Sequence, residues 1–357
     1  MNRKAIQLAF TYMGVIIGGG FASGQEILQF FTGYGIASVA GTVLAGLLFA
    51  FLGWQIARLG TRLQAPSHKE VLHALFGHKA GLVMDILLTF FLFGVGVAML
   101  AATGALFKQQ FDLSPLTGSI FMAVVVVLTL CLNVTRIVDL VSLATPFLIG
   151  LVLIITTYAL ITSNAPVDEL LVLSEAQQTV APHWAIGALL YASFNIAVGF
   201  PMLAVLAGRT TDIKTTALGG AMGGIGLGVL IMLLNVSLFS NLNQLQGAEL
   251  PTLMLASRLS PVLGLVMTAS ITCMIYSTAV GMFFAFSTRF STPETNRFRL
   301  ISLLSCGIGV ALSVFGFTEL VGTVYPLLGY LGLLLIAAII FNWYRNRGRA
   351  VAAARGQ

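Results

Sequence analysis

The stretch "MGVIIGGGFASGQE", from Met13 to Glu26, combines three consecutive glycines with a carboxylate inside a long apolar run. Glycine is a weak helix former, so Gly18, Gly19 and Gly20 favour an interruption of any helix built here. An interrupted helix leaves backbone groups free: amides at a helix N-terminus suit a carboxylate, and carbonyls suit a cation or an amine. The stretch therefore predicts a ligand site made largely of backbone.

A second stretch, "HWAIGALLYASFNIAVGFPML" (183–203), also places polar groups and helix breakers together. Ser193 and Asn195 lie at its centre, and Gly199 and Pro201 follow. We expect a second interrupted helix here, with aromatic side chains that either close over a ligand or pack in the core. The candidate ligand-binding residues of the two stretches are Gly18, Gly19, Gly20, Phe21, Ala22, Ser23, Glu26, Tyr191, Ser193, Phe194 and Asn195, with the amides from Phe21 to Ser23 expected to hold a carboxylate.

The elements that must position these residues are membrane helices. Of the 357 residues, 58% are hydrophobic and only 8% charged, and the mean hydropathy is +0.97. A soluble chain carries about 25% charged residues. The apolar runs are continuous and have the length that a spanning helix needs, whereas barrel strands would alternate in polarity. We therefore expect an all-α integral membrane protein whose partner is the lipid bilayer.

Ten spans account for the apolar runs, and we place them near 5–32, 36–59, 81–107, 115–134, 140–162, 183–207, 214–239, 260–287, 298–316 and 320–343. All but two of the 18 basic residues, Lys108 and Arg258, then fall on one side. The positive-inside rule makes that side cytoplasmic, so we expect a multi-pass protein of the inner membrane with both termini in the cytoplasm. The net charge of +6 is on this interpretation a topology signal, and no nucleic-acid partner is expected.

The ten spans divide into two sets of five, and the two weakened spans are the first of each set. Inverted repeats of this kind are common in secondary transporters, where unwound helices form the site near the midplane. We expect a single transmembrane domain over 1–357. It comprises a first repeat at about 5–162, a second at about 183–343 and a short basic tail at 344–357.

Glu26 is an ionisable residue inside a predicted span, which is a functional hypothesis by default. It could face the amine of a substrate, or it could take up and release a coupling proton. It could also be structural, accepting hydrogen bonds from exposed amides of a neighbouring interrupted helix. The sequence leaves the three roles open.

The residues of "GVIIGGGF" align without gaps to the unwound region of the first helix in the leucine-transporter (LeuT) fold of the amino acid–polyamine–organocation (APC) superfamily. More narrowly, the chain resembles the YkvI-type amino-acid permeases, whose first helix carries a GGGFASGQE-like signature. The resemblance covers nearly the whole chain by topology, and the first, sixth and eighth spans by motif. It implies a 5+5 inverted repeat in which helices 1 and 6 are discontinuous.

The resemblance also implies a sodium site. Carried over, its ligands are the carbonyls of Gly14, Ile17 and Met274 and the hydroxyls of Ser277 and Thr278 in "TASITCMIYSTAVGMFFAF". The alternative is that these hydroxyls bond to carbonyls one turn back, as hydroxyls in membrane helices often do. The chain departs from some relatives, which have an arginine or an aromatic residue where Gly24, Gln25 and Glu26 stand here. It also lacks the lysine that proton-coupled relatives can place in helix 5.

These observations favour a cation-coupled secondary transporter of a small amino acid or related amine, with Na+ as the expected coupling ion and H+ as the alternative. A membrane receptor for such a ligand on the same fold is the second hypothesis. No other cofactor is expected. An enzyme is not expected, because the spans contain no Ser/His/Asp or two-metal constellation and the chain has no P-loop motif. The substrate, the direction of transport and the oligomeric state are left open.

Overall fold

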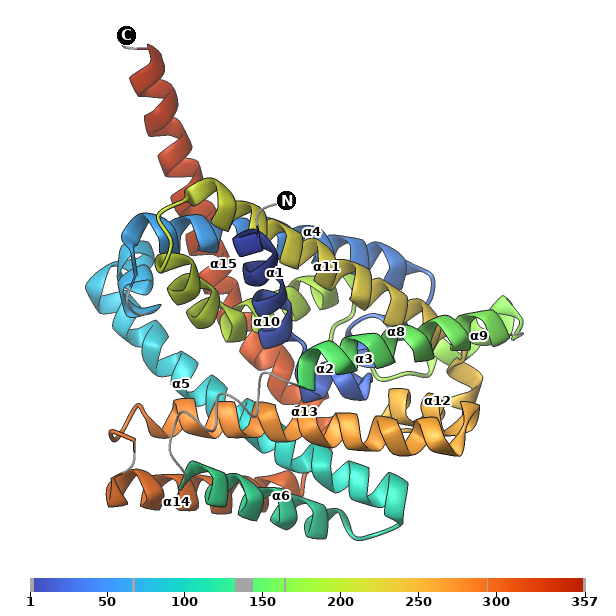
Figure 1. Cartoon of the computed structure of the whole chain (residues 1–357). Coiled ribbons are helices and arrows are strands. Elements are labelled where there is room, and N and C mark those ends of the chain that lie inside the picture. The colour runs from blue at the N-terminus through green and yellow to red at the C-terminus, as the bar shows by residue number, and fades with distance from the viewer. Residues whose placement is uncertain (1–2, 66–67, 132–143, 164, 294, 356–357) are drawn as a thin grey trace.

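The computed structural model describes residues 3–65, 68–131, 144–163, 165–293 and 295–355. In these ranges the regular structure is entirely helical, and both termini lie at the same end of the bundle (Figure 1). The helices are α1 (Arg3–Ile16), α2 (Gly19–Ser23), α3 (Gln25–Phe30), η1 (Thr32–Tyr34), α4 (Ala37–Leu63), α5 (His68–Phe111), α6 (Pro115–Leu130), α8 (Ala144–Thr162), α9 (Val167–Glu175), α10 (Trp184–Gly208), α11 (Ile213–Ser240), η2 (Leu242–Gln244), α12 (Pro251–Leu259), α13 (Pro261–Ser287), α14 (Asn296–Ser313) and α15 (Phe317–Arg355).

The predicted spans correspond to these helices, and the all-helical fold class is confirmed. Six helices in the described ranges, α4, α5, α10, α11, α13 and α15, are long and apolar enough to cross a membrane. The first predicted span is divided among α1, α2 and α3, as expected for an interrupted helix. The end of the predicted fourth span, 132–134, and the start of the predicted fifth span, 140–143, lie outside the described residues.

Two short helices were not anticipated. The short helices α9 and α12 lie between predicted spans. The sequence 61–81 does favour a short cytoplasmic helix, and the structure has a helix there as the first part of α5. Helix α5 begins at His68, before the predicted third span, and changes direction at Gly77, whose φ of 77° suits glycine.

The sixth span differs from its prediction, because α10 is one continuous helix from Trp184 to Gly208 with Pro201 inside it. The polar side chains at its centre are bonded without any unwinding. The Ser193 hydroxyl donates to the Gly329 carbonyl of α15, and the Asn195 amide donates to the Tyr191 carbonyl one turn back at 3.0 Å. A proline inside a helix removes one backbone bond and can be tolerated in a membrane bundle, so Pro201 alone does not interrupt α10.

Glycines bring α4 and α11 into backbone contact. A Cβ atom added to Gly53 would lie 2.6 Å from the Gly220 carbonyl oxygen, and one added to Gly46 would lie 3.0 Å from the Gly228 Cα. Small residues permit this close approach of helices in lipid. Helix α1 also packs closely against α11, since a Cβ added to Gly219 of α11 would lie 2.7 Å from the Ala5 carbonyl oxygen. Helix α1 therefore packs against a helix, α11, that is itself in backbone contact with α4.

Candidate functional site

The first span is interrupted directly after α1. The Ile17 amide donates to the Met13 carbonyl at 2.8 Å, which completes the last helical turn. The Gly18 amide donates to the Ile16 carbonyl at 2.8 Å instead of the Gly14 carbonyl, its partner in a continuous helix. Gly18 is extended, with φ of −104° and ψ of −168°. The Gly14 carbonyl thus loses its regular partner, as the predicted cation site requires.

A second turn follows at Gly24, which has a left-handed φ of 80° and separates α2 from α3. The Ser23 hydroxyl stabilises the turn, since it donates to the Gly20 carbonyl at 2.6 Å and accepts from the Gln25 amide at 3.1 Å. Ser23 is thus occupied by its own backbone in this structure.

Helix α12 supplies a hydrogen bond to this segment that the sequence did not indicate. Thr252 donates its hydroxyl proton to the Ala22 carbonyl at 2.5 Å.

The backbone amides available to hold a carboxylate differ from those predicted. Because α2 begins at Gly19, its first-turn amides are those of Gly19, Gly20 and Phe21 rather than Phe21 to Ser23.

The turn at Gly24 folds the Glu26 side chain back onto α2. A Cβ atom added to Gly20 would overlap Glu26 Oε1, so only glycine at this position leaves room for the carboxyl. Tyr191 of α10 and Tyr325 of α15 lie within electrostatic reach of the same carboxyl. The structure therefore brings Glu26 and Tyr191, two predicted site residues from different halves of the chain, to one place.

Glu26 is buried, with 5% of its surface exposed. Within the described ranges no ion pair reaches its carboxylate. Nor does any backbone amide of those ranges donate to Glu26, as the structural role would require. The Tyr191 hydroxyl lies near the carboxyl and is itself buried without a partner of regular hydrogen-bond geometry. The pair therefore offers acceptor oxygens to a donor that carries positive charge.

Aromatic rings enclose this position. The Tyr191 ring centroid lies 4.9 Å from that of Phe31 and 5.3 Å from that of Phe194, and the Phe194 ring lies 5.0 Å from that of Tyr325. Phe21 is also buried. Ser193 and Asn195, by contrast, bond to α15 and to α10 itself, so the structure does not bring their polar groups to Glu26 through a hydrogen bond.

Helix α13 is docked on the interruption through Thr278. Its Oγ1 accepts a hydrogen bond from the Gly19 amide at 3.2 Å, and a Cβ added to Gly18 would lie 2.9 Å from it. The sequence-based pairing of Thr278 with the first span is thus seen as a direct contact. Ser277 is half-buried and Met274 is buried. The roles of Gly14, Ile17, Met274, Ser277 and Thr278 as cation ligands stay predictions.

A charged cluster joins α5 to the end of α13, remote in sequence from the interruption. Asp85 pairs with Arg289, with His68 Nε2 at 3.1 Å and with Lys69 Nζ at 3.7 Å. Asp85 and Arg289 are both mostly buried, with 15% and 16% of their side-chain surface exposed. The cluster holds together two helices at what the charge distribution predicts to be the cytoplasmic end.

The chain is similar in sequence and in structure to known membrane proteins. It is 26% identical over 342 residues to the uncharacterized membrane protein YkvI of Bacillus subtilis (strain 168), which covers 94% of this chain and 95% of YkvI. No protein-family model matches the chain.

Two solved structures share the fold. MhsT in complex with L-phenylalanine matches with a TM-score of 0.63 at 16% identity, over 94% of this chain and 89% of MhsT. A Na+-coupled sialic acid symporter matches with a TM-score of 0.59 at 14% identity, over 94% of this chain and 78% of the symporter. The chain therefore has the LeuT fold, and its resemblance to YkvI is confirmed.

Proposed function

We propose that this LeuT-fold chain, a homologue of YkvI, is a cation-coupled secondary transporter of a small amino acid or related amine. The observation that carries the proposal is the buried Glu26 carboxyl, held against Gly20 at the interruption of the first span. The fold alone does not determine the substrate, because one fold hosts many functions. The chemistry at Glu26 is what favours an amine.

An ammonium group at this position would supply the positive charge that no described residue provides. It has three donors, and the Glu26 carboxyl and the unpartnered Tyr191 hydroxyl are both acceptors. Charge-assisted hydrogen bonds of this kind are the strong ones. The surrounding rings of Phe194 and Tyr325 would exclude water and favour a small side chain on the substrate.

The coupling ion would bind one step away, between α1 and α13. The Gly14 carbonyl, freed by the turn at Gly18, and the hydroxyls of Ser277 and Thr278 are the hard oxygen ligands that a monovalent cation such as Na+ prefers. Because Thr278 already holds the Gly19 amide, a cation there would bias the position of α13 relative to the interruption. That linkage would couple the ion to the substrate site.

Alternating access requires closed ends that can open. Gly19 is packed against α13 and α5, since a Cβ added to it would lie 2.8 Å from Ile275 Cγ1 and 2.8 Å from Met99 Sδ. The Asp85–Arg289 pair joins α5 to the end of α13. We infer that this ion pair must break when the site opens to the predicted cytoplasmic side.

Uptake into proteoliposomes tests the proposal. The purified chain is reconstituted and supplied with radiolabelled amino acids and amines under an inward sodium gradient, a proton gradient or neither. We expect accumulation of an amine-bearing substrate that depends on one gradient and falls at least about tenfold in Glu26→Gln, since one charge-assisted bond is lost. Ligand binding without accumulation under any gradient would identify a receptor, and accumulation unaffected by Glu26→Gln would place the amine elsewhere.

A further inference from the structure

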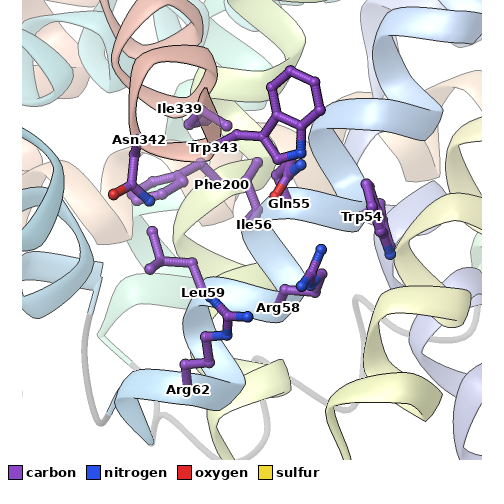
Figure 2. Close-up of a pocket in the computed structure, with 10 residues that line it drawn as sticks. All are labelled: Trp54, Gln55, Ile56, Arg58, Leu59, Arg62, Phe200, Ile339, Asn342 and Trp343. Carbon is purple, nitrogen blue, oxygen red and sulfur yellow. The ribbon is translucent and has the colours of Figure 1, made fainter. Parts of the chain in front are cut away.

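A cavity of about 450 Å³ opens between α4, α10 and α15, and no residue of α1, α2 or α3 lines it. Figure 2 shows side chains from α4 facing those of α15 across it. Phe200, Ile56 and Ile339 form an apolar floor, and all three are buried. The polar and aromatic lining consists of Trp54, Gln55, Arg58, Arg62, Asn342 and Trp343.

Hydrogen-bond donors gather on the α4 side of this cavity. Arg58 and Arg62 are four residues apart and share a helix face. Neither forms an ion pair within the ranges that the structure describes. The Nε2 atom of Gln55 is buried and has no hydrogen-bond partner. A buried donor without a partner is costly and indicates that something accepts from it.

Arg58 is held in place, and neither arginine is neutralised locally. The Arg58 guanidinium carbon lies 4.7 Å from the centroid of the Trp54 ring, a cation–π contact that restricts the side chain. The described lining contains no aspartate or glutamate. Two guanidinium groups and an amide N–H around one cavity match a phosphate group, whose oxygens accept bidentate hydrogen bonds from arginine.

The position of the cavity indicates which phosphate is available. Arg62 lies in the last turn of α4, on the side that the basic residues predict to be cytoplasmic, where anionic lipid headgroups concentrate. The lining also contains Trp54 and Trp343, and tryptophan is enriched at the level of the lipid headgroups. Beside the lining residues, Leu63 is 40% and Phe341 is 66% exposed, which leaves apolar surface for acyl chains.

We propose that this cavity binds a phosphate group, and that its source is the headgroup of an anionic phospholipid. The cavity is distinct from the proposed substrate site, so the proposal stands whether or not the chain transports an amine. Free phosphate would accept the same hydrogen bonds, and the experiment below distinguishes it from a lipid headgroup.

The tryptophans make the cavity measurable. The chain has three tryptophans, and Trp184→Phe leaves only Trp54 and Trp343, both in the cavity lining. The full-length Trp184→Phe protein is reconstituted in phosphatidylcholine bilayers that contain a small fraction of brominated phosphatidylglycerol or brominated phosphatidylcholine. We expect the brominated phosphatidylglycerol to quench the fluorescence at a mole fraction about tenfold lower than the neutral lipid does, because two charge-assisted contacts favour it.

Charge-matched variants assign the effect to the cavity. Arg58→Gln with Arg62→Gln should abolish the preference for phosphatidylglycerol. Arg297→Gln with Arg299→Gln removes the same charge from exposed positions on the same predicted side and should leave the preference intact. Gln55→Leu keeps both charges, should weaken the preference, and serves if the double arginine variant does not fold.

An equal loss of preference in both double variants would reduce the effect to general surface charge and overturn the proposal. A second arm adds inorganic phosphate to the protein in neutral detergent and records the melting temperature. A rise that Arg58→Gln with Arg62→Gln abolishes, without lipid discrimination in bilayers, would support the phosphate site with free phosphate as its occupant. If neither lipid discrimination nor stabilisation by phosphate is observed, the site is refuted.

Discussion

The segment from α1 to α3 and helix α10 pack against each other, and their backbones differ. The first segment is extended at Gly18 and left-handed at Gly24. Helix α10 keeps its helical course from Trp184 to Gly208, although Pro201 removes one backbone donor. Both segments carry small and polar residues near mid-span.

The difference lies in what the neighbouring helices offer. Around the first segment, Thr278 accepts from the Gly19 amide and Thr252 donates to the Ala22 carbonyl. These side chains replace backbone bonds that the interruption removes. In α10, Ser193 bonds to a carbonyl of α15 and Asn195 bonds within its own helix. A membrane helix is interrupted where its neighbours can satisfy the freed backbone groups, and breaker residues alone do not suffice.

The largest expected effect comes from adding one methyl group to the interrupted segment, at Gly19. Gly19→Ala places a Cβ 2.9 Å from the Ile275 Cα, which is backbone and cannot move aside. We expect overpacking of about 1–3 kcal/mol and loss of ligand binding. Gly199→Ala is the matched control in α10, since its Cβ would lie 3.3 Å from the Ile16 side chain. Melting temperatures and ligand-dependent shifts check both, and equal destabilisation would contradict the contrast.

Glu26→Gln tests whether the interruption serves the ligand. The substitution is nearly isosteric and breaks no ion pair in the described ranges, so the melting temperature should change little. Affinity for an amine should fall at least about tenfold, as expected for loss of a charged acceptor. Tyr191→Phe removes the second acceptor with a smaller expected loss. Calorimetric titration of each variant gives the affinities, and unchanged affinity in Glu26→Gln would leave the carboxyl a structural role.

Substitutions at Thr278 distinguish the structural role of its contact with the Gly19 amide from its proposed role in ion binding. Ser277→Ala with Thr278→Ala should abolish activation by sodium and cost about 1–3 kcal/mol of stability, because the buried Gly19 amide loses its acceptor. Thr278→Ser keeps the hydroxyl and should retain both properties. Uptake measured against sodium concentration checks the outcome. Full sodium activation in the double variant would show that the hydroxyls only serve packing.

The smallest expected effect is that of Pro201→Ala, which probes the continuity of α10. Alanine restores an amide that can donate to the Ala197 carbonyl and is a better helix former than proline. The melting temperature should therefore stay the same or rise. A marked fall would indicate that α10 is interrupted in the membrane after all. If stability rises while uptake slows, Pro201 acts as a hinge during transport.

The sequence predicted the spans well because long apolar runs are a strong signal. The predicted span 36–59 is realised as Ala37–Leu63, and 214–239 as Ile213–Ser240. Helices α9 and α12 were missed because they are short and lie outside the apolar runs. The turn at Gly24 was also missed, although the dipeptide Ser23–Gly24 is a local turn signal.

The site was predictable in part. The contact of the first span with Thr278 followed from the resemblance of "GVIIGGGF" to an unwound helix. The hydrogen bond from Thr252 to Ala22 joins residues 230 positions apart and depends on tertiary packing that no local pattern encodes. In the same way, Arg58 and Arg62 were interpreted as topology signals only. Their cavity requires Trp343, which α15 brings from the far end of the chain.

The contact of α4 with α11 has a mechanical consequence. With no side chain between Gly53 and Gly220, or between Gly46 and Gly228, a small rotation or sliding of one helix would press main-chain atoms together. The two helices therefore behave as one stiff strut. Motion must take place at softer contacts, such as the Phe93 ring of α5 between Phe283 and Phe286 of α13, where aromatic rings can change rotamer. The amides of the strut should be the last in the molecule to exchange with deuterium.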